Sequence, residues 1–259
     1  FSEIFTYIYS KDPQKTHIKE HLSKYFYILL IMEDAIIEKL EKSIQEETIK
    51  VTNKIIESNI ILDISAKSRA GAEISDYLED KFEKNYKKFS NNIIYAEGAP
   101  KGATKNPWDL KIKLKLDDHI EEVWVDFKAI KTTGLDSNPD IGTPNKQIKI
   151  MQEGFFYILF VYVFYEEHRK GLKFTKINNS YTKGYFLKDI SPTFRRNPKN
   201  QLQVNISAEP VKRSREDFIK LLTNKIKESH ERQIAISKKS LSEIDKIEDQ
   251  LLIKNQEII

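Results

Sequence analysis

The sequence predicts an α/β (α+β) fold in which helices flank a mixed central β-sheet. Apolar residues follow a helical period in the N-terminal part of the chain and again from residue 214 onward. Between these parts, residues 108–116 alternate strictly between apolar and polar side chains. A period of 3.6 residues gives a helix one apolar face, whereas a period of two gives a strand one apolar face. Helices on either side of such strands are expected to cover the sheet.

Two helices are predicted before the sheet. Residues 16–58 contain no proline, and lysine and glutamate fill most positions between the periodic apolar ones. These apolar positions are Ile36, Ile37, Leu40, Ile44, Val51 and Ile55. Residues 70–89 repeat the pattern, with Ile74, Tyr77, Leu78 and Phe82 on one face. Both spacings are typical of amphipathic helices.

A β-hairpin is predicted next. The sequence WDLKIKLKL places Trp108 and Leu110 on an apolar face and Asp109 on the opposite, polar face. The turn-like DDHIEE follows, and EVWVDFKA over residues 122–129 predicts a second strand. Strands joined by a short turn pair antiparallel, so we expect a hairpin.

Further strands and the C-terminal helices complete the predicted order. The apolar, aromatic and β-branched run FFYILFVYVFY, residues 155–165, predicts a buried central strand. Residues 184–187 and 201–206 are compatible with shorter strands. Ser214 and Asp217 form a helix N-cap pattern, after which one helix and a second, charged helix are predicted to the end.

These elements predict three regions within one compact domain. Residues 1–66 form a helical N-terminal region, residues 67–210 a sheet-bearing core, and residues 211–259 the C-terminal helices. A chain of 259 residues is long enough to bury a sizeable core.

Composition excludes several classes of site. The chain has no cysteine, which excludes disulfide scaffolds, thiolate zinc sites and cysteine nucleophiles. Five scattered histidines argue against a histidine-based metal site. Carboxylates remain as metal ligands, and they favour Mg²⁺ or Ca²⁺.

The sequence predicts a cytoplasmic protein. Its longest apolar run, residues 155–165, has 11 residues, whereas a membrane span needs about 18 or more. The first residues, FSEIFTYIYSKDPQ, lack the basic and then apolar pattern of a signal peptide.

The charge is concentrated in one segment. The formal net charge is only +4, but residues 167–200 hold nine basic and two acidic side chains, a local net charge of +7. Such a segment suits the phosphate backbone of a nucleic acid, because each bound Lys or Arg releases condensed counterions. The alternative is a solvated loop in a lysine-rich protein.

Three polar residues of the hairpin form a possible catalytic group. Asp126 and Lys128 are two residues apart and share one face of their strand, and pairing brings them near Asp109. Two carboxylates suit Mg²⁺, which would activate water and neutralise charge on a phosphate. The lysine would orient or deprotonate that water and offset charge on the scissile phosphate. The alternative is an exposed Asp–Lys pair without chemistry, since the spacing alone is common.

The surrounding motifs resemble those of a known nuclease superfamily. PWDL and WVDFKA, whose aspartates lie 17 residues apart, look like the PD-(D/E)xK signature. The helix AGAEISDYLEDKF, the D-[IL]-x-[IL] pattern from Asp109, AIKTTGLDSNPDIGT and NPKNQLQVNI are similar to segments of type II restriction endonucleases of the HpaI and HincII kind, in the EcoRV-like branch. The resemblance covers residues 68–222. It departs where Trp108 separates Pro107 from Asp109, and where Pro139 follows Asn138 rather than preceding it.

The resemblance implies a restriction-endonuclease type of sheet and a homodimeric, Mg²⁺-dependent enzyme that cuts double-stranded DNA at a short palindrome, with a central cut that leaves blunt ends. It also implies a cognate DNA methyltransferase. Asp109 and Asp126 would bind Mg²⁺, Lys128 would be the catalytic lysine, and Glu73 would support the site. A structure-specific or repair nuclease and a non-catalytic DNA-binding protein remain alternatives.

The same resemblance implies DNA contacts outside the catalytic group. Asn and Gln pair with adenine and Arg with guanine, and basic side chains also bind phosphates. The expected backbone contacts are Lys131, Thr132, Thr133, Arg195, Arg196 and Lys199. The expected groove and base contacts are Ser137, Asn138, Asp140, Asn145, Gln147, Asn200, Gln201 and Gln203, with Lys146 and Asn197 also expected to contact DNA.

Overall fold

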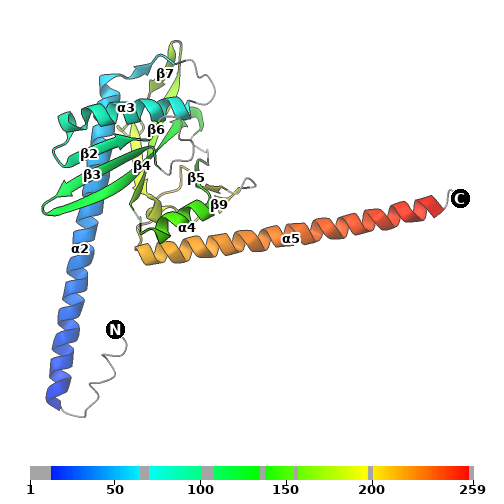
Figure 1. The fold of residues 1–259 in the computed structure, drawn as a ribbon, viewed down its shortest axis with the longest axis horizontal. Helices are drawn as coiled ribbons and strands as arrows, with labels where there is room; N and C mark the ends of the chain where they lie inside the picture. The colour runs from blue at the N-terminus through cyan, green and yellow to red at the C-terminus, as the bar shows by residue number, and fades with distance from the viewer. Residues whose placement is uncertain are drawn as a thin grey trace. The chain divides into compact units, whose positions relative to one another are not determined.

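The structure is a computed structural model that describes residues 13–64, 70–100, 108–134, 138–154, 157–197 and 201–256. The chain separates into two compact units, Phe1–Glu46 and Glu47–Ile259. The second unit contains the sheets and is the one that carries the predicted site (Figure 1). Within the described residues, no helix is long and apolar enough to cross a membrane.

Helix α2, Pro13–Ser58, confirms the first predicted helix and passes from the first unit into the second. Its last turns bury Val51, Ile55 and Ile56 in the second unit. Asn53 Nδ2 donates a hydrogen bond to Ser180 Oγ at 3.1 Å. The final turns of α2 are therefore part of the sheet-bearing unit.

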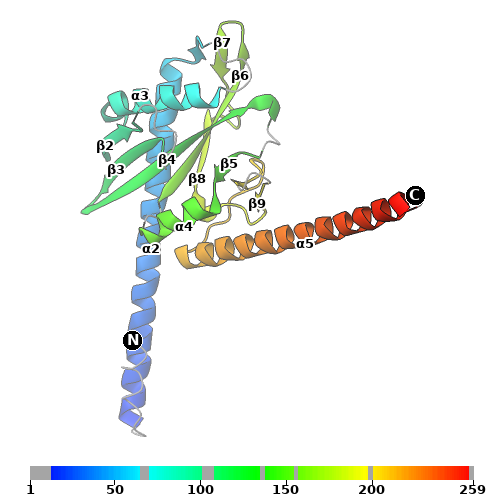
Figure 2. The same cartoon turned by 45° about the vertical axis from the view of Figure 1, so that its right-hand side comes forward.

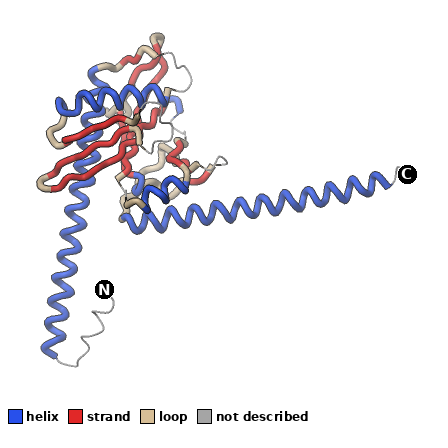
Figure 3. Tube along the Cα trace, in the orientation of Figure 1, coloured by secondary structure: helices blue, strands red, loops and turns tan. Residues whose placement is uncertain are grey.

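A mixed sheet forms the centre of the second unit and confirms the predicted fold class (Figure 3). In the described residues it has seven strands in the order β1-β7-β6-β4-β3-β2, with β8 paired to β6. The strands are β1 (Ile61–Leu62), β2 (Ile93–Gly98), β3 (Leu110–Leu116), β4 (His119–Lys131), β6 (Ile158–His168), β7 (Gly171–Phe174) and β8 (Thr182–Phe186). Strands β4 and β6 run parallel, whereas the other pairs are antiparallel.

The predicted hairpin is confirmed as β3 and β4. Leu110 lies opposite Val125 and Ile112 opposite Val123, and all four side chains are buried. The turn between the strands has Asp117 in the left-handed region with φ 52°, which Asp adopts more readily than most residues. Just before β3, Asp109 N donates to Val125 O at 3.0 Å, which holds Asp109 beside β4.

The predicted central strand is confirmed as β6. Its residues from Ile158 to Tyr165 are all buried, because β4 and β8 flank it and helices cover the sheet. Phe155 and Phe156 of the predicted run lie outside the described residues. Helix α3, Gly71–Phe89, confirms the second predicted helix and buries Ile74, Leu78 and Phe82. In Figures 1 and 2, α3 crosses in front of the sheet and the last turns of α2 run behind it.

A second, small sheet was not predicted as such. Strand β10 lies between β5 and β9 in this sheet. The bounds are β5 (Asp140–Gly142), helix α4 (Pro144–Gln152), β9 (Arg195–Arg196) and β10 (Leu202–Gln203). The strand predicted over residues 201–206 is therefore shorter, although Leu202, Val204 and Ile206 still alternate into the core. Two short 3-10 helices complete the described elements, η1 (Thr132–Gly134) and η2 (Leu187–Asp189).

The C-terminal part forms one helix, α5 (Arg215–Gln256), so the prediction of two separate helices is wrong. Its sequence contains no glycine or proline that would break the backbone hydrogen bonds. The predicted cap is confirmed, because Asp217 N donates to Ser214 Oγ at 3.0 Å. Phe218 and Leu222 fix the first turns of α5 in the core.

Replacing Gly171 with alanine is expected to destabilise the second unit strongly. Gly171 has φ +130°, and an added Cβ would collide with the Leu62 carbonyl oxygen and lie 2.7 Å from Ile64 N. We expect urea denaturation to show a loss of about 3 kcal/mol, as is typical when strain and a clash combine. Gly154→Ala is the control: φ is +80° and nothing lies within 4 Å, so about 1 kcal/mol is expected. Equal losses in the two variants would contradict the proposed clash.

Candidate active site

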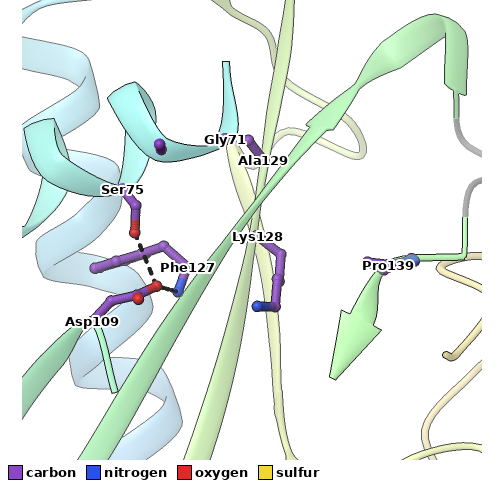
Figure 4. Close-up of a pocket in the computed structure, with 8 residues that line it drawn as sticks. Gly71, Ser75, Asp109, Phe127, Lys128, Ala129 and Pro139 are labelled. Atoms are coloured by element: carbon purple, nitrogen blue, oxygen red, sulfur yellow. Dashed lines mark hydrogen bonds between the residues drawn. The ribbon is translucent and has the colours of Figure 1, made fainter. Parts of the chain in front are cut away.

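An open cleft of about 330 Å³ lies at the end of the β3–β4 hairpin, beside the start of α3 (Figure 4). Its walls come from three places far apart in the sequence: α3, the hairpin and the segment before β5. The lining residues are Gly71, Ala72, Ser75, Asp109, Phe127, Lys128, Ala129 and Pro139. Two of the three predicted catalytic residues therefore line one cleft.

The Asp109 carboxylate is held firmly in this cleft. Its backbone N donates to Val125 O at 3.0 Å, and its backbone O accepts from Ala99 N at 2.8 Å. The side-chain Oδ2 accepts hydrogen bonds from Phe127 N at 2.7 Å and from Ser75 Oγ at 2.9 Å (Figure 4). The hairpin ladder and α3 together fix the direction of this carboxylate.

Burial is the main cause that raises the pKa of Asp109, to about 6. The neighbouring Asp126 charge raises it further, while Lys128 and the two hydrogen bonds act in the opposite direction. The two carboxylates therefore carry more negative charge than Lys128 and the hydrogen-bond donors around them neutralise. A bound cation would relieve this repulsion.

Asp126 and Lys128 form a close ion pair on β4. Lys128 Nζ lies 2.6 Å from Asp126 Oδ1. Asp126 Oδ1 is buried, and no donor among the described residues is well aligned with it, so Lys128 meets it as an ion pair. Burial works to lower the pKa of Lys128, but the charges of Asp126, Asp109 and Asp140 outweigh it and raise that pKa. Lys128 therefore carries a positive charge at neutral pH.

The two carboxylates fit a hard divalent cation. The described residues contain no group of three or more metal-ligating side chains. Mg²⁺ needs no such group, because one or two carboxylates, waters and substrate phosphates complete its shell. The oxygen of Asp126 that lacks an aligned donor suits a cation, as does the repulsion between Asp126 and Asp109.

The structure does not bring Glu73 to the cleft. Its side chain is exposed in the first turn of α3. Glu79 instead lies close to the site: its Oε1 is 3.1 Å from Ser75 Oγ, and its Oε2 accepts from Ala99 N at 3.3 Å. Burial first, and then the Asp109 charge, raise the pKa of Glu79 to about 7. The sequence did not single out Glu79. Ser75 and Glu79 lie one helical turn apart on a face that also carries apolar residues, and this spacing could have indicated a polar pair facing the site.

Four of the predicted DNA contacts join in one polar network on the small sheet. Asp140 Oδ1 accepts from Gln203 Nε2 at 2.8 Å and from Asn197 Nδ2 at 3.4 Å. Gln201 N donates to Asn197 Oδ1 at 2.9 Å. The charge of Asp140 also acts on Lys128, so this network lies near the cleft.

The other predicted DNA contacts are dispersed. Lys146 lies near the cleft, where burial is the main cause that lowers its pKa and the Asp126 charge acts against this. Gln147 is buried, and its Nε2 donates to Ile141 O at 2.5 Å.

Lys131 Nζ pairs with Glu167 at 2.6 Å. Arg196 donates to Ser229 Oγ at 3.5 Å. Thr132 is partly buried, and the exposed predicted contacts are Thr133, Asn138, Asn145 and Arg195. Ser137, Lys199 and Asn200 lie outside the described residues.

Comparison with protein families gives a match over most of the chain. The family model described as "SwaI-like: SwaI restriction endonuclease" matches residues 36–244. This range contains the cleft, both sheets, α3, and α5 as far as residue 244. A comparison with curated proteins gives no match.

Proposed function

Because this chain belongs to the SwaI-like family of restriction endonucleases, we propose that it is a Mg²⁺-dependent type II enzyme that cuts both strands of DNA at a short palindrome. As a restriction endonuclease it is a site-specific nuclease with DNA as its substrate. The observation that carries the proposed active site is that Asp109 and Lys128 line one cleft, with Asp126 ion-paired to Lys128. This arrangement supports assignment to the PD-(D/E)xK superfamily, with residues 67–210 as the nuclease core.

Asp109 and Asp126 would hold the Mg²⁺ ion. When bound, the ion supplies positive charge to the scissile phosphate and lowers the pKa of water. Hydrogen bonds from Phe127 N and Ser75 Oγ orient the Asp109 carboxylate, so little rearrangement is needed on binding. The ion pair with Lys128 similarly positions Asp126.

Lys128 would act as a fixed positive charge beside the phosphate. The carboxylates around it raise its pKa, so it keeps its proton at neutral pH. A charged ammonium orients the attacking water and offsets the negative charge that grows on the phosphate oxygens. The raised pKa therefore favours orientation and charge stabilisation over proton abstraction by Lys128.

The network around Asp140 would read bases. Asn197, Gln201 and Gln203 are partly exposed, and amide side chains match base edges in the major groove. Arg195, exposed on the neighbouring strand β9, would contact a phosphate. The resemblance to the HpaI and HincII kind supports a central, blunt cut and a cognate methyltransferase.

Digestion of phage DNA tests the proposed function. With Mg²⁺ we expect discrete fragments whose sequenced ends share one short palindrome. We expect EDTA to stop the cleavage and added Mg²⁺ to restore it. A smear, or cutting confined to branched DNA, would point to a structure-specific nuclease instead. Binding without cleavage at any metal concentration would point to a non-catalytic DNA-binding protein.

A further inference from the structure

The small sheet, with β5 and β9 labelled in Figure 2, presents one polar face. Gln203 pairs with Asp140 of β5 on one side and with Arg195 of β9 on the other. Residues paired directly across antiparallel strands point to the same face, so these three side chains form one row. The opposite face is covered, because Leu202 is buried there and Arg196 donates a hydrogen bond to α5. The polar row therefore lies on the outer face of the sheet, where its side chains are partly or fully exposed.

Asp140 fixes the orientation of the Gln203 amide. A carboxylate accepts hydrogen bonds and donates none, so the group 2.8 Å from Asp140 Oδ1 is the amide nitrogen, Nε2. This contact uses one of the two N–H groups. Within the described residues, no hydrogen bond engages the second N–H or the carbonyl Oε1 of Gln203. Gln203 thus offers one donor and one acceptor side by side.

Adenine matches this pair of groups. Its edge in the major groove presents the N7 acceptor next to the N6 amino donor, the complement of a free N–H and a free carbonyl. Guanine presents two acceptors there, cytosine a donor, and thymine an acceptor beside a methyl group. Any base other than adenine leaves one of the two Gln203 groups without a partner, which costs binding free energy.

The neighbouring amides do not offer the same pair of groups. Asn197 Nδ2 donates to Asp140 Oδ1 and to Gln201 Oε1, both at 3.4 Å, and its Oδ1 accepts from Gln201 N at 2.9 Å. Both amide hydrogens of Asn197 are engaged, so it cannot donate to a base without breaking the network. The carbonyl of Gln201 is also engaged, which leaves only donors, and adenine, guanine and thymine all present an acceptor to them.

We propose that Gln203 reads an adenine in the major groove through this bidentate contact, and that Asp140 is the positioning residue that holds its amide. The inference rests on the proposed function and narrows the base-reading network to one side chain. The major groove admits a two-stranded β-ribbon such as the β9–β10 pair. Arg195, exposed beside Gln203 on β9, suits the phosphate that flanks the base.

The base that Gln203 reads lies close to the catalytic cleft. Pro139, the residue before Asp140, lines the cleft, and its carbonyl oxygen accepts from Val204 N at 3.4 Å. Val204 is the residue after Gln203. The segment that forms one wall of the cleft is therefore bonded directly to the strand that carries the reader.

Selection of bound duplexes from a random-sequence pool, with Ca²⁺ in place of Mg²⁺, gives the recognised sequence without relying on cleavage. We expect Gln203→Met to select the wild-type sequence with one A·T pair, or its symmetric pair in a palindrome, no longer specified. Methionine keeps the length of the side chain but removes both hydrogen-bonding groups. Its affinity for the recognised duplex should fall about 10- to 100-fold, the value of one bidentate contact. Gln233→Met, the same change at an exposed position of α5, should alter neither property.

A base analogue tests the contact itself. 7-Deazaadenine lacks the N7 acceptor and keeps the N6 amino group. At the position read by Gln203, we expect it to weaken binding of the wild-type chain about 10-fold and of Gln203→Met less than about twofold. Asp140→Leu should reduce this sensitivity to the analogue, and Asp140→Asn, which keeps an acceptor oxygen for Gln203, should restore it. A purely structural role of either residue would lower the affinity for both duplexes equally.

Several results would overturn the proposal. They are a selected sequence that Gln203→Met leaves unchanged or relaxes at a G·C pair, a wild-type chain that selects no sequence, and wild-type binding that 7-deazaadenine weakens at no adenine. Because these measurements use binding alone, their result is separate from the proposed function. Selection through Gln203 without cleavage in Mg²⁺ contradicts only the function. Site-specific cleavage that Gln203→Met leaves equally specific contradicts only the role of Gln203.

Discussion

Replacing Lys128 with alanine is expected to lower the rate of DNA cleavage by about 10³-fold, within the range that a positioned catalytic group contributes. The variant loses the ammonium that lies 2.6 Å from Asp126 Oδ1 and faces the cleft. DNA affinity should change little, because the base contacts around Asp140 and the phosphate contact of Arg195 proposed above lie on other elements. Plasmid cleavage assays and fluorescence anisotropy in EDTA measure the two properties separately.

Lys113→Ala is the matched control for this variant. Lys113 lies on β3, pairs with Glu122 at 3.8 Å and is not among the residues that line the cleft. It removes the same charge from the same hairpin, so we expect cleavage to remain within a factor of about two. Cleavage unaffected by Lys128→Ala would refute the assignment of the site. Equal losses in both variants would indicate a general electrostatic effect.

Replacing Asp109 with asparagine is expected to abolish cleavage and yet stabilise the metal-free protein. Burial and the Asp126 charge raise the pKa of Asp109 to about 6, so the ionised carboxylate disfavours the folded state. At pH 8 the gain in the free energy of unfolding should be at most about 3 kcal/mol, since one pKa unit corresponds to about 1.4 kcal/mol. Asparagine retains an oxygen that accepts from Phe127 N.

The gain should depend on pH in a defined direction. A pKa that is higher in the folded state means that folding favours the protonated carboxyl, so wild-type stability falls as the pH rises from about 4 to 6. The advantage of Asp109→Asn should therefore be absent near pH 4, develop over this window and be complete at pH 8. Urea denaturation in EDTA at the two pH values measures it. Loss of the Asp109 charge also lowers the pKa of Glu79, which adds to the gain.

Asp118→Asn provides the control, because Asp118 is exposed in the turn between β3 and β4. We expect it to leave both stability and cleavage unchanged. Destabilisation by Asp109→Asn at pH 8 would show that the hydrogen bond from Ser75 outweighs the electrostatic cost. Full cleavage by this variant would exclude Asp109 as a metal ligand.

The sequence determined the parts of this protein that depend on local pattern. The alternation from Trp108 predicted the hairpin, and the apolar run before Tyr165 predicted the central strand, because the backbone alone decides which side chains share a face. The same reasoning placed Asp126 and Lys128 on one face of β4. Strand pairing then brought Asp109 beside them, as the motif spacing predicted.

Only the tertiary structure decided which distant groups complete the site. Glu79, rather than Glu73, lies near Asp109, because the packing of α3 on the hairpin sets which helical face meets the cleft. Asp140 and Gln203 are 63 positions apart, and their contact depends on the pairing of β5 with β10. A periodic pattern describes one element at a time. Contacts between elements depend on how the whole core packs, and no single segment of the sequence contains that information.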